Sequence, residues 1–126
     1  MSDGRREAAE QRRMFLYEGK TLEEWLPEAV ERVVEDFDPL KVILFGSLAR
    51  GEAGYDSDVD LLVVFEHVEW ENKRDLTVDI RRAIARVPIP VDVIVTDVDE
   101  IDRRGHIVGT VLRPALREGK IVYERP

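Results

Sequence analysis

The most informative part of the sequence is the stretch Gly46-Ser47-Leu48-Ala49-Arg50-Gly51-Glu52-Ala53-Gly54-Tyr55-Asp56-Ser57-Asp58-Val59-Asp60. The apolar run from Lys41 to Phe45 precedes it and predicts a β-strand, and the run from Asp58 to Phe65 predicts a second one. Side chains two residues apart on a strand share a face, so Asp58 and Asp60 should present two carboxylates about 7 Å apart along the chain. Such carboxylates repel each other, and a hard divalent cation such as Mg²⁺, which prefers oxygen ligands, offsets that repulsion.

A third acid, Asp92, lies within the apolar run from Val91 to Thr96, which predicts a further strand. A strand buried on both faces would not normally carry a charge, so something must compensate Asp92. If this strand neighbours the one with Asp60, three carboxylates converge and can hold two Mg²⁺ ions about 3.5–4 Å apart for phosphoryl chemistry. Asp92 is then also the candidate base for the attacking hydroxyl. The alternative is that all three acids are solvated carboxylates at strand ends. Four acids that follow are expected in an exposed turn or helix start: Asp97, Asp99, Glu100 and Asp102.

The turn before these acids is predicted to bind phosphate. Gly46 and Ser47 follow a strand and precede a helical turn, so backbone N–H groups and a hydroxyl can face an anion. Gly46 allows a phosphate to approach the backbone closely. Arg50, one turn further on, is expected to add a charge-assisted contact, the alternative being a solvated helix arginine. Ser57, just before Asp58, is assigned to the same anion-binding set.

The remaining pattern predicts helices that alternate with strands, which indicates an α/β (α+β) fold with a small mixed sheet flanked by helices. Apolar residues at helical spacing run from Leu22 to Phe37, with Thr21 and Glu24 as a capping box and with the regular helix beginning near Pro27. Three further elements are expected: a helix over residues 71–87 with Arg81 outside its apolar stripe, a helix over residues 107–118 interrupted by Pro114, and an edge strand over residues 121–123. Residues 1–20 are interpreted as an N-terminal arm, helical or flexible, and residues 21–126 as the domain.

Composition restricts the function. The chain has 126 residues, which fits one domain. Its formal net charge of −8 argues against nonspecific binding to nucleic acid, which depends on Lys and Arg neutralising phosphates. Because there is no cysteine, disulfides, thiolate zinc sites and a cysteine nucleophile are excluded. The first residues are polar and the longest apolar run is Leu61 to Phe65, so we expect neither a signal sequence nor a membrane span, and a cytoplasmic protein.

Taken together, Gly46-Ser47, the pair Asp58-x-Asp60 and the later Asp92 resemble the DNA polymerase β nucleotidyltransferase superfamily, and the small size resembles its minimal nucleotidyltransferase branch. The resemblance covers roughly Leu22 to Tyr123. It implies a nucleotidyltransferase fold and a Mg²⁺-dependent enzyme that uses a nucleoside triphosphate such as ATP. It further implies that Gly46 and Ser47 hold the phosphates and that the three acids bind two Mg²⁺ ions.

Members of the minimal branch are commonly paired with a helical HEPN-domain protein, and several such pairs resemble toxin-antitoxin systems in which the antitoxin transfers AMP to a tyrosine of the toxin. The resemblance therefore implies a HEPN partner, whose surface we expect to be basic because this chain is acidic. The short chain agrees with this, since few residues remain for an acceptor-binding domain. Two alternatives stay open: a noncatalytic antitoxin that masks its partner, and transfer to a small-molecule acceptor.

Overall fold

The structure is a computed structural model that describes residues 16–52, 54 and 57–126. Its elements, in chain order, are α2 (Leu22–Phe37), β1 (Lys41–Phe45), α3 (Gly46–Ala49), β2 (Val59–Phe65), the short 3-10 helix η1 (Trp70–Asn72), α4 (Lys73–Ile84), β3 (Val91–Asp97), α5 (Val98–Arg104), α6 (Leu112–Glu118) and β4 (Lys120–Glu124). Most of the expected N-terminal arm, residues 1–15, lies outside the described residues.

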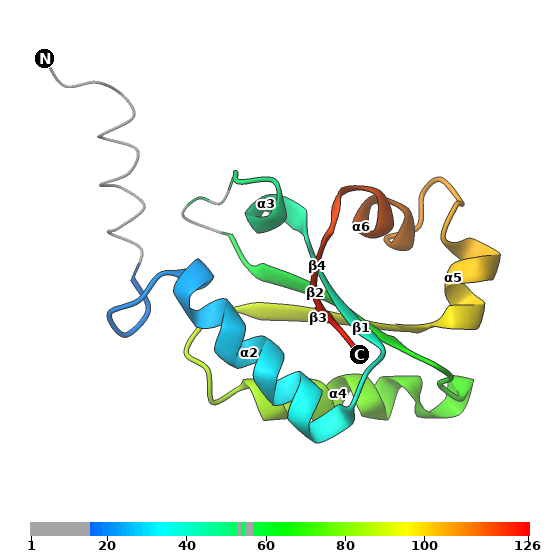
Figure 1. Cartoon of the computed structure of the whole chain (residues 1–126), viewed down its shortest axis with the longest axis horizontal. Helices are drawn as coiled ribbons and strands as arrows, with labels where there is room; N and C mark the ends of the chain where they lie inside the picture. Colours follow the sequence, from blue (N-terminus) through cyan, green and yellow to red (C-terminus); the bar gives the residue numbers. More distant parts are fainter. Residues whose placement is uncertain (1–15, 53, 55–56) are drawn as a thin grey trace, which may run out of the picture.

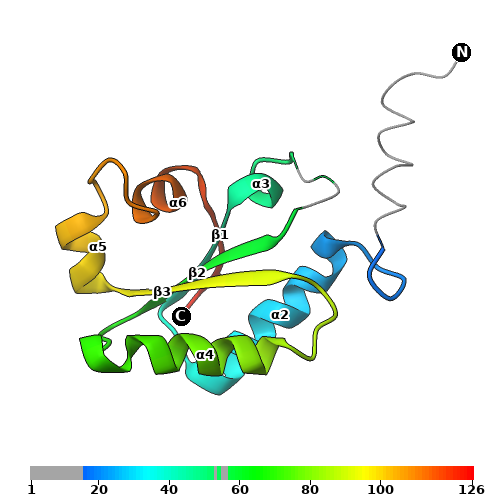
Figure 2. The same ribbon diagram turned by 180° about the vertical axis from the view of Figure 1, so that it is seen from behind.

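The four strands form one mixed sheet in the order β3-β2-β1-β4. Strands β2 and β3 run parallel, and β1 is antiparallel to both β2 and β4. Helix α4 makes the crossover that a parallel pair requires. Figures 1 and 2 show α2 and α4 on one face of the sheet, and α3, α5 and α6 on the other. The predicted fold class, a small mixed sheet flanked by helices, is confirmed.

Alternate side chains of β2 belong to the two hydrophobic clusters on opposite faces of the sheet. Val59, Leu61 and Val63 are fully buried on the face that α2 and α4 cover. Leu62 and Val64 point the other way, into a second cluster that includes Leu112 and Ala115 of α6. Each fully buried aliphatic side chain of this size contributes about 1.5–3 kcal/mol to folding. Because side chains alternate along the strand, Asp60 is on the α6 side of the sheet.

Helix α2 begins earlier than predicted. The capping box is present, since the Thr21 hydroxyl accepts from the Glu24 backbone N–H and the Glu24 carboxylate accepts from the Thr21 backbone N–H. The regular helix starts at Leu22, so the expectation that it begins near Pro27 is wrong. Pro27 leaves the Glu23 carbonyl without a helical donor, but both residues are exposed and water can replace that donor.

Residues 16–20 form a tight turn against α2. Tyr17 and Lys20 make an isolated β-bridge, and the Tyr17 carbonyl accepts a 2.6 Å hydrogen bond from the indole Nε1 of Trp25. The Lys20 ammonium lies 4.1 Å from the centre of the Trp25 ring, which is a cation–π contact. The last residues of the predicted arm therefore pack on the domain.

The C-terminal helix is shorter than predicted. Residues 107–111 form a turn in which the Thr110 hydroxyl donates to the Ile107 carbonyl at 2.9 Å and Gly109 has a φ of +92°. Helix α6 then starts at Leu112 instead of residue 107. This start places Pro114 in the first turn, where no intrahelical hydrogen bond is lost. The predicted edge strand is confirmed as β4, at one end of the sheet.

Within residues 16–52, 54 and 57–126, no helix combines the length and apolar character needed to cross a bilayer.

Candidate active site

The three predicted acids gather at one end of the parallel pair β2–β3. Asp60 of β2 and Asp92 of β3 are direct register partners, and Asp58 immediately precedes β2. Burial raises the pKa of the Asp60 carboxyl above its ordinary value, and the charges of Asp58 and Asp92 raise it further, while the nearby Arg50 lowers it. The strands are thus neighbours, as the sequence analysis required for convergence, and the carboxylates repel one another.

Gly46 brings the glycine-serine turn directly against Asp60. On the other side of β2, Asp60 is the register partner of Phe45, the last residue of β1, so Gly46 follows at the same level of the sheet. Gly46 has a φ of +77°, and a Cβ added there would lie 2.1 Å from Asp60 Oδ2. Only glycine satisfies both the left-handed backbone and this close approach. From the sequence, we explained Gly46 by the close approach of a phosphate. The structure gives a second explanation, which is the close approach of the Asp60 carboxylate.

The two predicted serines join the ends of the loop between α3 and β2. The Ser47 hydroxyl donates to the Ser57 hydroxyl oxygen at 3.0 Å, and the Gly54 backbone N–H donates to the same oxygen at 2.7 Å. Ser47 is the second residue of α3, where the first N–H groups of a helix lack intrahelical acceptors. Both predicted nucleotide-binding serines therefore lie together beside the acids.

Arg50 is engaged by carboxylates from two segments. Its Nε lies 3.0 Å from Glu52 Oε2, and its Nη1 lies 3.9 Å from Glu118 Oε2 at the end of α6. The side chain is 43% exposed, and its charge acts on Asp60. Arg50 is therefore near the acids, as expected, but in this arrangement it contacts protein carboxylates.

Asp92 is the acid whose surroundings differ most from the expectation. We expected a strand buried on both faces, but β3 is an edge strand and the Asp92 side chain is 52% exposed. Its compensating partner is Arg81 of α4, whose Nη2 lies 3.1 Å from Asp92 Oδ1. An ion pair this exposed contributes at most about 1 kcal/mol and can be exchanged for another cation. No sequence motif predicts the pairing of Arg81 with Asp92, because it depends on how α4 crosses the edge of the sheet.

In this structure the three acids are not arranged as the ligands of a metal ion. Among the described residues, no group of three or more Asp, Glu or His side chains is arranged to hold a metal ion. The donor set nevertheless suits a hard divalent cation, since it consists of carboxylates, and both burial and the charges of Asp58 and Asp92 raise the Asp60 pKa. Asp92 would have to leave Arg81 to join Asp58 and Asp60 around such an ion.

Asp97, the last residue of β3, has a structural role. Asp97 is at a helix start, one of the two expected places, because it caps α5 by accepting from the Glu100 backbone N–H at 2.8 Å. It is buried, however, and not exposed. It also accepts from the Val68 backbone N–H at 3.0 Å. Burial alone would raise the pKa of Asp97, but these two backbone donors outweigh it and lower the pKa. Asp97 is five residues from Asp92, roughly 16 Å along the strand, so it does not compete for the same ion.

The glycine-serine turn, the acid pair across β2 and β3 and the mixed sheet together define a protein of the nucleotidyl-transfer class. A family model described as a nucleotidyltransferase domain matches residues 26–117, and this range includes every candidate site residue. The chain therefore belongs to the nucleotidyltransferase-domain family.

A solved structure agrees with this assignment. The chain is similar to a presumed nucleotidyltransferase from Sulfolobus solfataricus, with 28% sequence identity and a TM-score of 0.57. The similarity covers 99% of this chain and 93% of the other. Among curated proteins, no sequence matches the chain significantly.

Proposed function

We propose that this chain transfers AMP from ATP, in a Mg²⁺-dependent reaction, to a hydroxyl of a partner protein. It would be the antitoxin of a toxin-antitoxin pair that consists of a HEPN-domain protein and a minimal nucleotidyltransferase. The observation that carries the catalytic part is the register pairing of Asp60 with Asp92, beside the Gly46 backbone. Family membership supports nucleotidyl transfer in general. The identities of the metal, the nucleotide and the acceptor go beyond family membership and are proposed here.

In this proposal, Asp58, Asp60 and Asp92 hold two Mg²⁺ ions. The ions would neutralise charge on the transferred phosphoryl group and on the oxygens that attack and leave it. The protein contributes the positions: β2 and β3 hold Asp60 and Asp92 level with each other, and the Gly46-Ser47 turn presents backbone N–H groups to the triphosphate. Asp92 also accepts the proton of the attacking hydroxyl, once it has left Arg81.

The acceptor is assigned to a second protein because the acids stand at an open end of the sheet. Asp58 is exposed and Asp92 is half exposed, so a large acceptor can approach them. After the sheet and its helices are assembled, the chain provides no separate acceptor-binding domain among its described residues. A masking antitoxin without catalysis is the second candidate, and the observation that favours it is the Arg81–Asp92 pair, which occupies one of the three acids.

Thermal unfolding tests the metal-nucleotide site. Mg²⁺ with ATP at about 100 times its Kd should stabilise the chain by about 2.7 kcal/mol, which corresponds to a rise in Tm of several degrees. ATP alone should have a much smaller effect, because its phosphates are repelled by the acids. The Asp60→Asn variant is the control. In this variant the Tm shift with Mg²⁺ and ATP should be nearly as small as the shift with ATP alone. Equal shifts with and without Mg²⁺, at saturating ATP, would remove the metal-bridged site from the proposal.

A further inference from the structure

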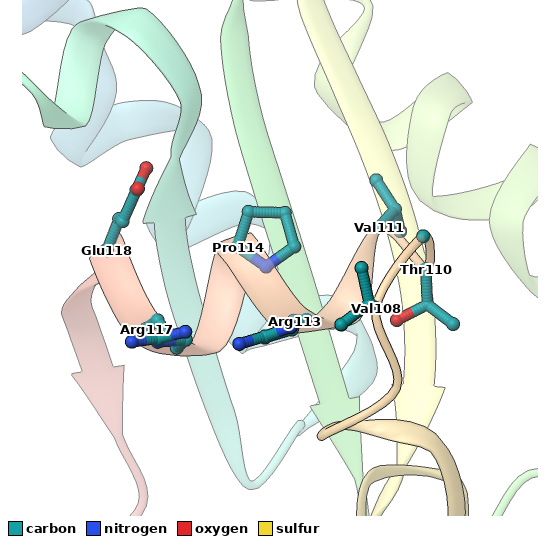
Figure 3. Close-up of a pocket in the computed structure, with 8 residues that line it drawn as sticks. Val108, Thr110, Val111, Arg113, Pro114, Arg117 and Glu118 are labelled. Atoms are coloured by element: carbon teal, nitrogen blue, oxygen red, sulfur yellow. The ribbon is translucent and has the colours of Figure 1, made fainter.

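A groove lies between the 108–111 turn and helix α6, on the same side of the sheet as Asp60. Its volume is about 860 Å³, in the range of ligand-binding clefts, and it is lined by Val108, Gly109, Thr110, Val111, Arg113, Pro114, Arg117 and Glu118. Figure 3 shows Arg113 and Arg117 extending from one side of α6, with Val108 and Thr110 beyond the Arg113 end. Val108 is 75% exposed and Val111 is 46% exposed, so apolar surface stands next to two cations.

The charge of this region is opposite to that of the chain. Residues 103–117 contain four arginines and no acidic residue. Since the whole chain carries −8, removing these four positive charges leaves −12 on the rest. Arg113 and Arg117 are one helical turn apart and share a face of α6. In the part of the chain that the structure describes, neither of them forms an ion pair, in contrast to Arg50, Arg81 and Arg125.

The groove leads to the candidate active site. Leu112 and Ala115 of α6 belong to the same buried cluster as Leu62 of β2, and Asp60 points to the same face two residues earlier. Glu118, at the last turn of α6, lies 3.9 Å from Arg50, whose charge acts on Asp60. Figure 1 places α6 beside α3, the helix that begins at Gly46. A molecule lying along α6 would therefore reach the acids at the Glu118 end.

We propose that this groove binds the acceptor protein, through a segment that places acidic side chains against Arg113 and Arg117 and an apolar side chain against Val108 and Val111. The inference rests on the proposed function, which makes the acceptor a protein. The exposed valines and the small number of cations favour a protein segment over nucleic acid, which would need a more extended row of Lys and Arg. In this proposal an acidic contact segment takes the place of the basic contact surface that the net charge led us to expect.

Charge reversal tests the groove. The probe is the product of the gene adjacent to the one that encodes this chain. Its Kd for the full chain is measured by titration calorimetry without nucleotide, so the result does not depend on catalysis. The double substitution Arg113→Glu and Arg117→Glu should weaken binding at least tenfold, because buried or close charge pairs across an interface contribute this much. Arg113→Lys with Arg117→Lys should keep most of the affinity. The Mg²⁺-ATP shift in Tm should stay as in the wild type, since neither arginine belongs to the nucleotide site.

The matched control is Arg74→Glu with Arg82→Glu, which makes the same charge change at exposed positions of α4, on the other face of the sheet. It should leave the Kd within about twofold, as expected for charges outside an interface. An unchanged Kd in the Arg113/Arg117 variant, equal weakening in the control, or no binding by the wild type would overturn the inference. Transfer of AMP to RNA that is lost in the Arg113/Arg117 variant would also overturn it, in favour of nucleic acid. If binding depends on the groove but no AMP is transferred, the docking surface stands and the proposed transfer fails.

Discussion

Replacing Asp60 with asparagine should lower nucleotidyl transfer by roughly two orders of magnitude or more, because metal-assisted charge stabilisation contributes several kcal/mol to the barrier. Asp60 is the central acid, as register partner of Asp92 on one side and neighbour of Gly46 on the other. The change is isosteric, so the loss should appear with the fold intact. Radiolabelled AMP transfer and thermal unfolding of the same samples measure both effects.

The unliganded Asp60→Asn variant should be slightly more stable than the wild type at neutral pH. Because the pKa of Asp60 is raised in the folded chain, its charged form opposes folding at pH above that raised pKa, and this penalty disappears as the pH falls through it. The difference in stability between wild type and variant should therefore shrink at acidic pH. Asp36→Asn, an exposed acid near the end of α2, is the control for removing one charge. Wild-type transfer rates in Asp60→Asn would exclude the assigned metal site.

Replacing Gly46 with alanine should damage both stability and transfer. A left-handed backbone costs an alanine about 1–2 kcal/mol. The new Cβ would also lie 2.1 Å from Asp60 Oδ2, so the carboxylate has to move away from its position level with Asp92. We expect transfer to fall by at least about tenfold to a hundredfold, because small displacements of reacting groups have effects of this size. Denaturant unfolding and steady-state transfer kinetics measure the two losses.

Gly51 offers a matched control for this substitution. It has a φ of +72°, close to that of Gly46, but a Cβ added there meets nothing within 4 Å among the residues that the structure describes. Gly51→Ala should therefore show the backbone cost of about 1–2 kcal/mol without the loss of transfer. If both alanine variants lose transfer equally, backbone strain in the loop explains the effect and the contact with Asp60 does not.

Local patterns predicted the parts of the fold that depend on local physics. The alternation of β2, the capping box at Thr21 and the edge strand β4 follow from residue spacing and side-chain chemistry, and all are confirmed. The adjacency of the strands that carry Asp60 and Asp92 was a conditional expectation and is also confirmed. The bounds of the helices were less accurate, because the solvent exposure of Pro27 and the 107–111 turn depend on tertiary context.

The surroundings of the site could not be predicted from local patterns. The Arg81–Asp92 pair joins α4 to β3, and the Arg50–Glu118 contact joins α3 to α6, so both depend on how helices lie on the sheet. The capping role of Asp97 had a signal, since an aspartate before Val98 can begin a helix. Its second donor, the backbone N–H of Val68, is far along the chain and could not be predicted. The groove along α6 likewise arises only from the folded arrangement.

The most direct test of the account is the intact mass of the partner. The chain is co-expressed with the protein encoded next to its gene, and the partner is weighed after purification with the wild type and with Asp92→Asn. The wild type should add about 329 Da per transfer, the mass of AMP left after ATP loses pyrophosphate in this phosphoryl chemistry. The Asp92→Asn chain should add nothing, because it lacks both a ligand and the base. A partner that is bound and inhibited yet unmodified by the wild type would contradict the account and favour the masking antitoxin.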